Sequence, residues 1–203
     1  MSATSRDVAY KVKQDGFVKV RQPGGGTTTL RVIDHAAKRL TEEIPNFPFL
    51  EDYLNGSVSL VPVPRSSPLK PGSLWPTHRI CEAMKARGLG ANVLPCLERT
   101  QNVQKSSLAA PGQRPDPDAH YNSVRVSTLR LLPSTTAITL VDDIITRGST
   151  FIGLVRRLEE AFPDVEIRCL ALIRTMSGGD VPSILAPVQG TVSFVGGQLT
   201  RTP

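Results

Sequence analysis

The sequence predicts an α/β fold, in which a parallel twisted sheet with flanking helices is joined to a small N-terminal α+β subdomain. Four short apolar runs alternate with helical patterns, which favours right-handed β-α-β units. The runs lie near residues 57–63, 91–97, 138–142 and 165–173. A length of 203 residues suits one such domain with a modest addition. The third run ends on two adjacent acids, followed by a glycine-containing loop and an amphipathic helix.

Residues 1–50 are predicted to form the N-terminal subdomain, a small sheet plus a helix. Apolar residues alternate with Lys or Arg on both sides of Asp15-Gly16, a dipeptide that favours a hairpin turn. The expected elements are a hairpin over residues 9–22, a third strand over residues 27–33, and a helix from His35 to about Glu43 with Asp34 as its N-cap.

Residues 51–203 are predicted to form the core. Its first strand runs into Pro64-Arg65-Ser66, a rigid turn that offers a cation and a hydroxyl group. A helix over residues 76–87 and a strand over residues 91–97 follow. Residues 98–122 then form a long irregular stretch with basic residues and prolines, and loops of this length are usually functional or flexible.

The strand that ends on Asp142 and Asp143 carries the strongest functional signal. Backbone N–H groups of the loop that follows, together with the dipole of the next helix, suit a phosphate group. Carboxylates repel phosphate but accept hydrogen bonds from sugar hydroxyls, so the pattern predicts a site for a phosphorylated sugar. The plain alternative is an acidic, solvated turn after a core strand. The loop residues are Thr146, Arg147, Gly148, Ser149 and Thr150. Later strands are expected over residues 165–173 and 191–195.

The stretch from Val141 to Thr150 resembles the phosphoribosyl-pyrophosphate (PRPP) binding motif of type I phosphoribosyltransferases. The Val-Pro-Val-Pro run over residues 61–64 is similar to the competence-protein-F-like branch of that superfamily. Arg147, which stands before the loop glycine, is similar to the amidophosphoribosyltransferase-like branch. The resemblance covers residues 55–175, and it is close only over the motif from Val141 to Thr150.

The resemblance implies a Mg²⁺-dependent enzyme that transfers ribose 5-phosphate from PRPP to a nitrogenous base or amine and releases pyrophosphate. It also implies a homodimer, and an N-terminal subdomain that acts as a hood over the base. The resemblance implies that Asp142 and Asp143 contact the ribose and, indirectly, the metal ion, while residues Thr146 to Thr150 bind the 5-phosphate. It implies that Pro64, Arg65 and Ser66 bind pyrophosphate, and that Arg65, Arg99 and Lys105 make catalytic contacts with phosphate. Arg174 and Phe194 would contact the base.

Two alternative functions stay open at this stage. One is a regulator that binds PRPP or a nucleotide without turning it over, and the other is a DNA-uptake or defence accessory protein on the same fold. The net charge of +6 is compatible with nucleic acid, but the basic residues are scattered along the sequence, so a nucleic-acid partner is not favoured.

Composition indicates a soluble, cytoplasmic protein without a membrane partner. Cys81, Cys96 and Cys169 lack the spacing of a metal site, and their odd number fits a reducing compartment. No apolar run reaches membrane-spanning length, and the first residues are unlike a signal peptide.

Overall fold

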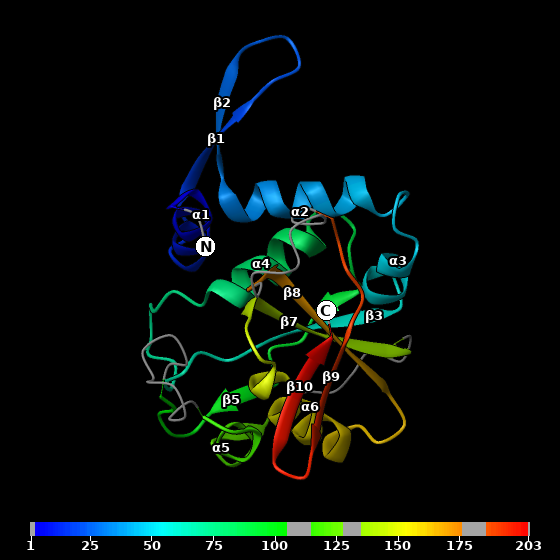
Figure 1. Ribbon diagram of the computed structural model, residues 1–203. Coiled ribbons are helices and arrows are strands. Elements are labelled where there is room, and N and C mark those ends of the chain that lie inside the picture. The colour runs from blue at the N-terminus through cyan, green and yellow to red at the C-terminus, as the bar shows by residue number, and fades with distance from the viewer. Residues whose placement is uncertain (1–2, 105–114, 128–134, 176–185, 203) are drawn as a thin grey trace.

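The computed structural model describes residues 3–104, 115–127, 135–175 and 186–202, and Figure 1 shows their arrangement. The elements in chain order are α1 (Ala3–Lys13), β1 (Phe17–Arg21), β2 (Thr27–Arg31), α2 (Val32–Glu43), α3 (Phe49–Leu54), β3 (Val58–Pro62), α4 (Pro76–Lys85), β4 (Asn92–Val93), β5 (Leu97–Arg99), α5 (Pro117–Asn122), β6 (Val124–Val126), β7 (Ala137–Ile145), α6 (Ser149–Ala161), β8 (Glu166–Arg174), β9 (Thr191–Val195) and β10 (Gln198–Thr202). Within these described residues, no helix is both long and apolar enough to cross a membrane.

The central sheet has the order β4-β3-β7-β8, and all of its neighbouring strands are parallel. Every residue of β3 is buried, as are the first five residues of β7. Strands covered on both faces need apolar side chains on both faces, which is why these segments read as continuous apolar runs. The predicted α/β class, with a parallel sheet and flanking helices, is confirmed.

Two hydrophobic clusters fill the two faces of the sheet. On one face, Ile80 and Met84 of α4 pack with Leu60 and Val141 of the sheet. On the other face, residues of α6 pack against β7, among them Phe151, Leu154, Leu158, Ile138 and Leu140. Burying a large apolar side chain stabilises the fold by about 1.5–3 kcal/mol, so the side chains of these two clusters hold α4 and α6 against the sheet.

The N-terminal segment shares the first of these clusters. Val12 of α1 and Val32, Ile33 and Ala37 of α2 are buried in the same cluster as Leu60 of the sheet. Helices α1 and α2 therefore pack on the sheet rather than around a core of their own. The domain boundary at residue 50 and the role of the segment as a hood stay predictions.

The predicted hairpin over residues 9–22 is wrong. Residues 9–13 belong to helix α1, in which Ala9 and Val12 are buried on one face at helical spacing. Asp15 adopts a left-handed φ of 49°, and the Gly16 N–H donates to the Lys11 carbonyl over 2.8 Å. Asp15-Gly16 thus ends a helix instead of turning a hairpin, because a left-handed residue followed by glycine suits both structures.

The hairpin lies one element later, between β1 and β2. These strands pair antiparallel and turn through residues 22–26, which include three glycines. Helix α2 then begins at Val32, three residues before the predicted start. Arg31 is its N-cap in extended conformation without a side-chain cap, and Asp34 lies in the first turn.

Other differences concern the segments that follow β4. The strand predicted over residues 91–97 is divided, since β4 joins the main sheet while β5 pairs antiparallel with β6. Helix α5 lies within the stretch predicted to be an irregular loop. Strand β10 was not predicted, and it forms a C-terminal hairpin with β9.

Candidate functional site

The order of the strands reverses between β3 and β7, and the space beyond the carboxyl ends of these two strands is here called the crevice. From β3 the chain continues to β4 on one side, while β7 and then β8 lie on the other. The crossover helices α4 and α6 pack on opposite faces of the sheet. Ligands of open α/β sheets bind where the strand order reverses in this way. The two strand ends are adjacent, because Pro62 pairs with Val141 and the Val63 N–H donates to the Val141 carbonyl over 2.9 Å.

The β7–α6 loop lies at this crevice. Strand β7 does not end on the acids, as the sequence predicted, but continues through them to Ile145, where it still pairs with β8. Gly148 is the N-cap of α6 with a left-handed φ of 95°, a conformation that glycine adopts without strain. The first turn of a helix has N–H groups without intrahelical partners. The loop of residues 146–150 therefore presents backbone donors of the kind that bind phosphate.

The C-terminal hairpin packs against this loop. A Cβ atom on Gly148 would lie 2.6 Å from Cγ1 of Val192 in β9, so only glycine allows this close approach. Arg201 of β10 donates to the carbonyl of Thr175 over 2.6 Å, which holds the hairpin at the carboxyl end of β8. The hairpin is thus one wall of the candidate site. The Gly196-Gly197 turn between two alternating segments is the sequence signal that predicts it.

The acid pair is half-buried at the end of the sheet. The Asp143 N–H donates to Oδ1 of Asp142 over 2.8 Å. Burial and, after it, the neighbouring charge of Asp143 raise the pKa of Asp142 well above its usual range, while Lys13 of α1 opposes this shift. An ionised Asp142 is therefore short of stabilising partners in this structure. Hydroxyl donors or a cation would supply them.

The raised pKa of Asp142 predicts that this carboxyl group lowers the stability of the folded protein at neutral pH. A carboxyl group with a raised pKa in the folded state loses stability as pH rises from its unfolded pKa through its folded pKa. We expect Asp142→Asn to match the wild type near pH 4 and to be more stable at neutral pH, by about 1–3 kcal/mol. Thermal melts from pH 4 to 8 measure this, with exposed Asp52→Asn as the control. A variant that is less stable at neutral pH contradicts the prediction.

The turn after β3 is held by hydrogen bonds from the segment that leads into α4. The Val63 carbonyl accepts from Trp75 Nε1 over 2.9 Å and from Thr77 Oγ1 over 2.6 Å. Pro64 is buried, and the exposed Arg65 donates from Nη1 to the Leu74 carbonyl over 2.9 Å. The Arg65 guanidinium thus lies at the surface in the turn after β3, where a backbone contact holds it.

Arg99 lies behind this turn. It is buried, its Nε donates to the Arg65 carbonyl over 2.9 Å, and its Nη1 donates to Ser123 Oγ over 2.5 Å. Burial lowers the pKa of Arg99 to about 10. These contacts link the backbone of the turn to Ser123. Direct contact of Arg99 with phosphate stays a prediction.

His120 was missed in the sequence and contacts the loop residue Thr150. It is buried, with Nε2 lying 3.4 Å from Thr150 Oγ1. Burial and, after it, Arg99 lower the pKa of His120 to about 4, so the imidazole is neutral at physiological pH. Helix α5 approaches α6 closely, because a Cβ on Gly153 would lie 2.3 Å from the Pro117 carbonyl. Asp116-Pro117, an N-cap followed by proline, is the signal that predicts this helix.

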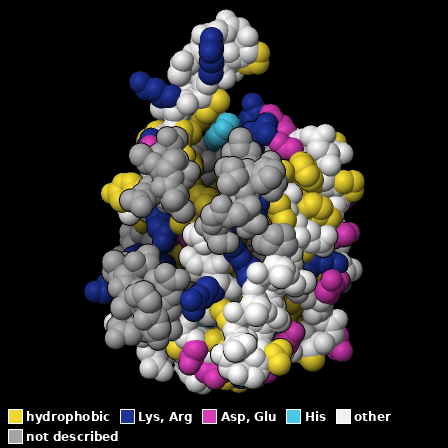
Figure 2. All heavy atoms as spheres, viewed as in Figure 1, with side chains coloured by type: hydrophobic (Ala, Val, Ile, Leu, Met, Phe, Trp, Pro, Cys, Tyr) yellow, Lys and Arg dark blue, Asp and Glu magenta, His cyan; other side chains and the backbone are white. Residues whose placement is uncertain are grey.

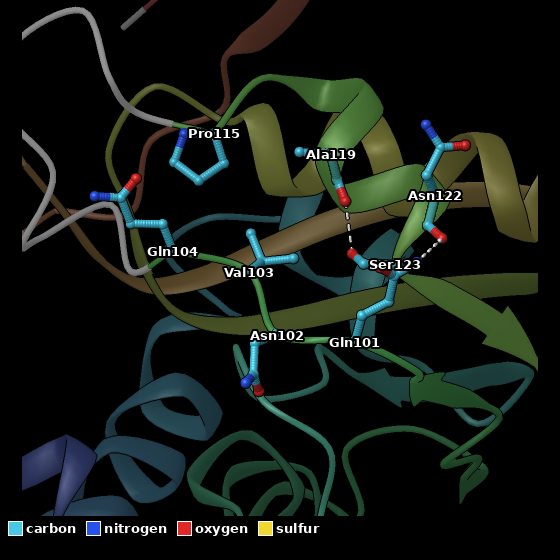
Figure 3. Close-up of a pocket in the computed structure, with 8 residues that line it drawn as sticks. All are labelled: Gln101, Asn102, Val103, Gln104, Pro115, Ala119, Asn122 and Ser123. Carbon is cyan, nitrogen blue, oxygen red and sulfur yellow. Dashed lines mark hydrogen bonds between the residues drawn. The ribbon is translucent and has the colours of Figure 1, made fainter.

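A cavity of about 360 Å³ lies beside Arg99, between residues 101–104 and α5 (Figure 3). One of its walls is tied to the turn after β3, since the Val103 N–H donates to the Ser66 carbonyl over 2.8 Å. The other wall includes Ser123, which binds Arg99. Its lining residues are Gln101, Asn102, Val103, Gln104, Pro115, Ala119, Asn122 and Ser123.

The structure describes two of the three remaining predicted site residues. Arg174 pairs with Ile145 at the carboxyl end of β8, and Phe194 is half-buried two residues from Val192 in β9. Both lie in elements that border the crevice, and their roles toward a base stay predictions. Lys105 lies outside the described residues.

The described residues contain no group of three His, Cys, Asp or Glu side chains able to hold a metal ion. The oxygens of Asp142 and Asp143 are hard ligands of the type that Mg²⁺ prefers. A Mg²⁺ ion commonly keeps water and substrate phosphates as most of its ligands. The two carboxylates therefore fit a magnesium ion that takes its other ligands from water and a phosphorylated substrate.

No protein-family model and no curated protein matches this chain. Two solved structures are similar in part. One is a Helicobacter pylori xanthine-guanine-hypoxanthine phosphoribosyltransferase, with 13% identity, a TM-score of 0.37, and coverage of 71% of this chain and 75% of that chain. The other is an adenine phosphoribosyltransferase, with 14% identity, a TM-score of 0.38, and coverage of 83% of this chain and 89% of that chain.

Proposed function

We propose that this protein is a Mg²⁺-dependent phosphoribosyltransferase, which transfers ribose 5-phosphate from PRPP to a nitrogenous base or amine. The bond from C1 of the ribose to pyrophosphate breaks, and a bond from C1 to the acceptor nitrogen forms. The acceptor nitrogen loses a proton, and pyrophosphate leaves.

The observation that carries this proposal is the meeting of two different loops at the crevice. The β7–α6 loop offers helix N–H donors next to a pair of carboxylates. The turn after β3 brings the Arg65 cation to the adjacent strand end. PRPP has the matching groups, with a 5-phosphate, two ribose hydroxyls and a pyrophosphate spread along one molecule.

The chemistry needs little more than these groups. As pyrophosphate departs, positive charge grows on the sugar ring and negative charge grows on the leaving group. In this proposal Asp142 and Asp143 would accept hydrogen bonds from the ribose, and Arg65 would stabilise the pyrophosphate. A bound Mg²⁺ would neutralise further charge on the leaving group. Fixed groups of this kind lower the barrier by positioning and electrostatics, without a covalent intermediate.

The direct test is the release of pyrophosphate from PRPP in the presence of Mg²⁺ and a panel of purine bases, pyrimidine bases and amines. We expect release with at least one acceptor and loss of release when a chelator removes Mg²⁺. PRPP binding is measured in parallel by calorimetry. If PRPP binds tightly but no acceptor supports the release of pyrophosphate, the protein is a PRPP-binding regulator and not an enzyme. If PRPP does not bind, both functions are excluded.

A further inference from the structure

The hairpin of β1 and β2 projects from the body of the protein as a separate arm (Figure 1). At its base, Val18 packs against the core, and Asp15 forms an ion pair with Arg31 over 2.9 Å. Beyond the base, the two strands pair only with each other in the described structure. A two-stranded ribbon that stands alone in water is marginally stable. A partner that lies along it would therefore stabilise it.

The charge of the arm has one sign. Residues 16–33 contain Lys19, Arg21 and Arg31 and no acidic residue. Lys19 and Arg21 have no carboxylate within ion-pair distance among the described residues. Other surface cations differ, since Lys38 and Arg39 on α2 pair with Glu42 and Glu43. On the face shown in Figure 2, the arm carries dark blue side chains and no magenta ones.

The register gathers these cations on one face. Phe17 pairs with Arg31, Lys19 with Thr29, and Arg21 with Thr27, and directly paired residues project on the same side of a sheet. Lys19 and Arg21 are two residues apart, which is about 7 Å along a strand. The opposite face holds Val18, Val20 and Leu30, which are half-buried. One face of the arm is therefore an exposed row of cations, threonine hydroxyls and one aromatic ring.

We propose that this face of the arm binds the sugar-phosphate backbone of a nucleic acid. Arg, Lys and Thr side chains are the donors that contact phosphates, and a two-stranded ribbon fits the major groove of a duplex. An anionic membrane is a poorer match, because the tip over residues 22–26 is Gln-Pro-Gly-Gly-Gly and has no large apolar side chain to insert. The arm projects from the body of the protein (Figure 1), and this proposal does not rest on the proposed enzyme activity.

The test compares the wild type with Lys19→Ala/Arg21→Ala and with the control Lys38→Ala/Arg39→Ala. Both double variants lower the net charge from +6 to +4, since each removes two cations. Fluorescence anisotropy with labelled duplex DNA, single-stranded DNA and duplex RNA is measured between 50 and 300 mM salt. We expect the arm variant to bind at least about tenfold more weakly at low salt, with a salt slope reduced by about 1.4–1.8. The control should keep most of the wild-type affinity.

Several results would overturn the proposal. They are wild-type protein that binds none of the three nucleic acids, equal losses in the two double variants, and unchanged binding by the arm variant. Binding to phosphatidylserine vesicles but not to nucleic acid, lost in the arm variant, would assign the arm to a membrane instead. A dimer seen by light scattering and lost in the arm variant, without nucleic-acid binding, would assign it to a second copy. Circular dichroism confirms that both variants are folded.

Discussion

Replacing both acids at the end of β7, in the variant Asp142→Asn/Asp143→Asn, should strongly weaken PRPP binding while leaving the protein folded. Asn keeps the size of Asp and the ability to accept one hydrogen bond, but it removes the charge that strengthens bonds from ribose hydroxyls. A hydrogen bond to a charged group contributes about 1.5–3 kcal/mol and one to a neutral group about 0.5–1.5 kcal/mol, so the change at two positions weakens binding by about 30- to 150-fold. Calorimetry with PRPP and Mg²⁺ measures the affinity.

This variant separates a binding role from a structural one. Because the pKa of Asp142 is raised in the folded state, the uncharged variant should melt at least as high as the wild type at neutral pH. Lost binding together with equal or higher stability identifies the acids as ligand groups. The control Glu51→Gln/Asp52→Asn changes two adjacent exposed acids at α3, before β3 begins, and should bind normally. Unchanged PRPP affinity in the folded Asp142/Asp143 variant would refute the ribose site.

The second large effect is expected for Arg65→Ala, which should reduce turnover far more than it reduces PRPP binding. Negative charge on the pyrophosphate increases as the bond to C1 breaks, so a cation beside it stabilises the transition state more than the bound substrate. We expect kcat to fall by about 10²–10³-fold with a change in PRPP affinity below about tenfold. Arg65 is exposed, and its side chain donates to the Leu74 carbonyl at the surface, so the fold should tolerate the change.

The controls for Arg65 use the same turn. Lys70→Ala removes an exposed cation five residues further on and should leave turnover unchanged. Arg65→Lys keeps the charge without the planar guanidinium and should restore part of the rate. Equal losses of binding and turnover in Arg65→Ala would mean that Arg65 contributes uniform binding, as a PRPP-binding regulator requires. No loss of either would remove Arg65 from the site.

The parallel sheet and its central loop were predictable from the sequence. Segments buried on both faces must be apolar throughout, so β3 and the first half of β7 stand out as apolar runs. The β7–α6 loop was also readable, because glycine before a helix with an apolar stripe marks a helix start with free N–H donors. These signals are local, and a local signal survives in any tertiary arrangement.

The prediction of a hairpin over residues 9–22 was wrong because the sequence pattern there is ambiguous. Alternation of Lys with apolar residues over residues 9–14 fits a strand, but Ala9 and Val12 also fit one face of a helix. Packing of Val12 against the sheet decides for the helix. Because the hairpin is instead formed by β1 and β2, Lys19 and Arg21 lie on a projecting arm. The scattered charges of the sequence did not indicate this arm.

What the sequence determined by itself is the fold class and the identity of the loop that would hold phosphate, since both depend on side chains close together in the chain. Only the tertiary structure decided what surrounds that loop. Strand order placed the Arg65 turn beside Asp142, and the C-terminal hairpin brought Val192 against Gly148. Packing of α5 on α6 brought His120 to Thr150. These contacts join residues separated by 30 or more positions, and no periodicity within a short window reports which distant segment will fill a given space.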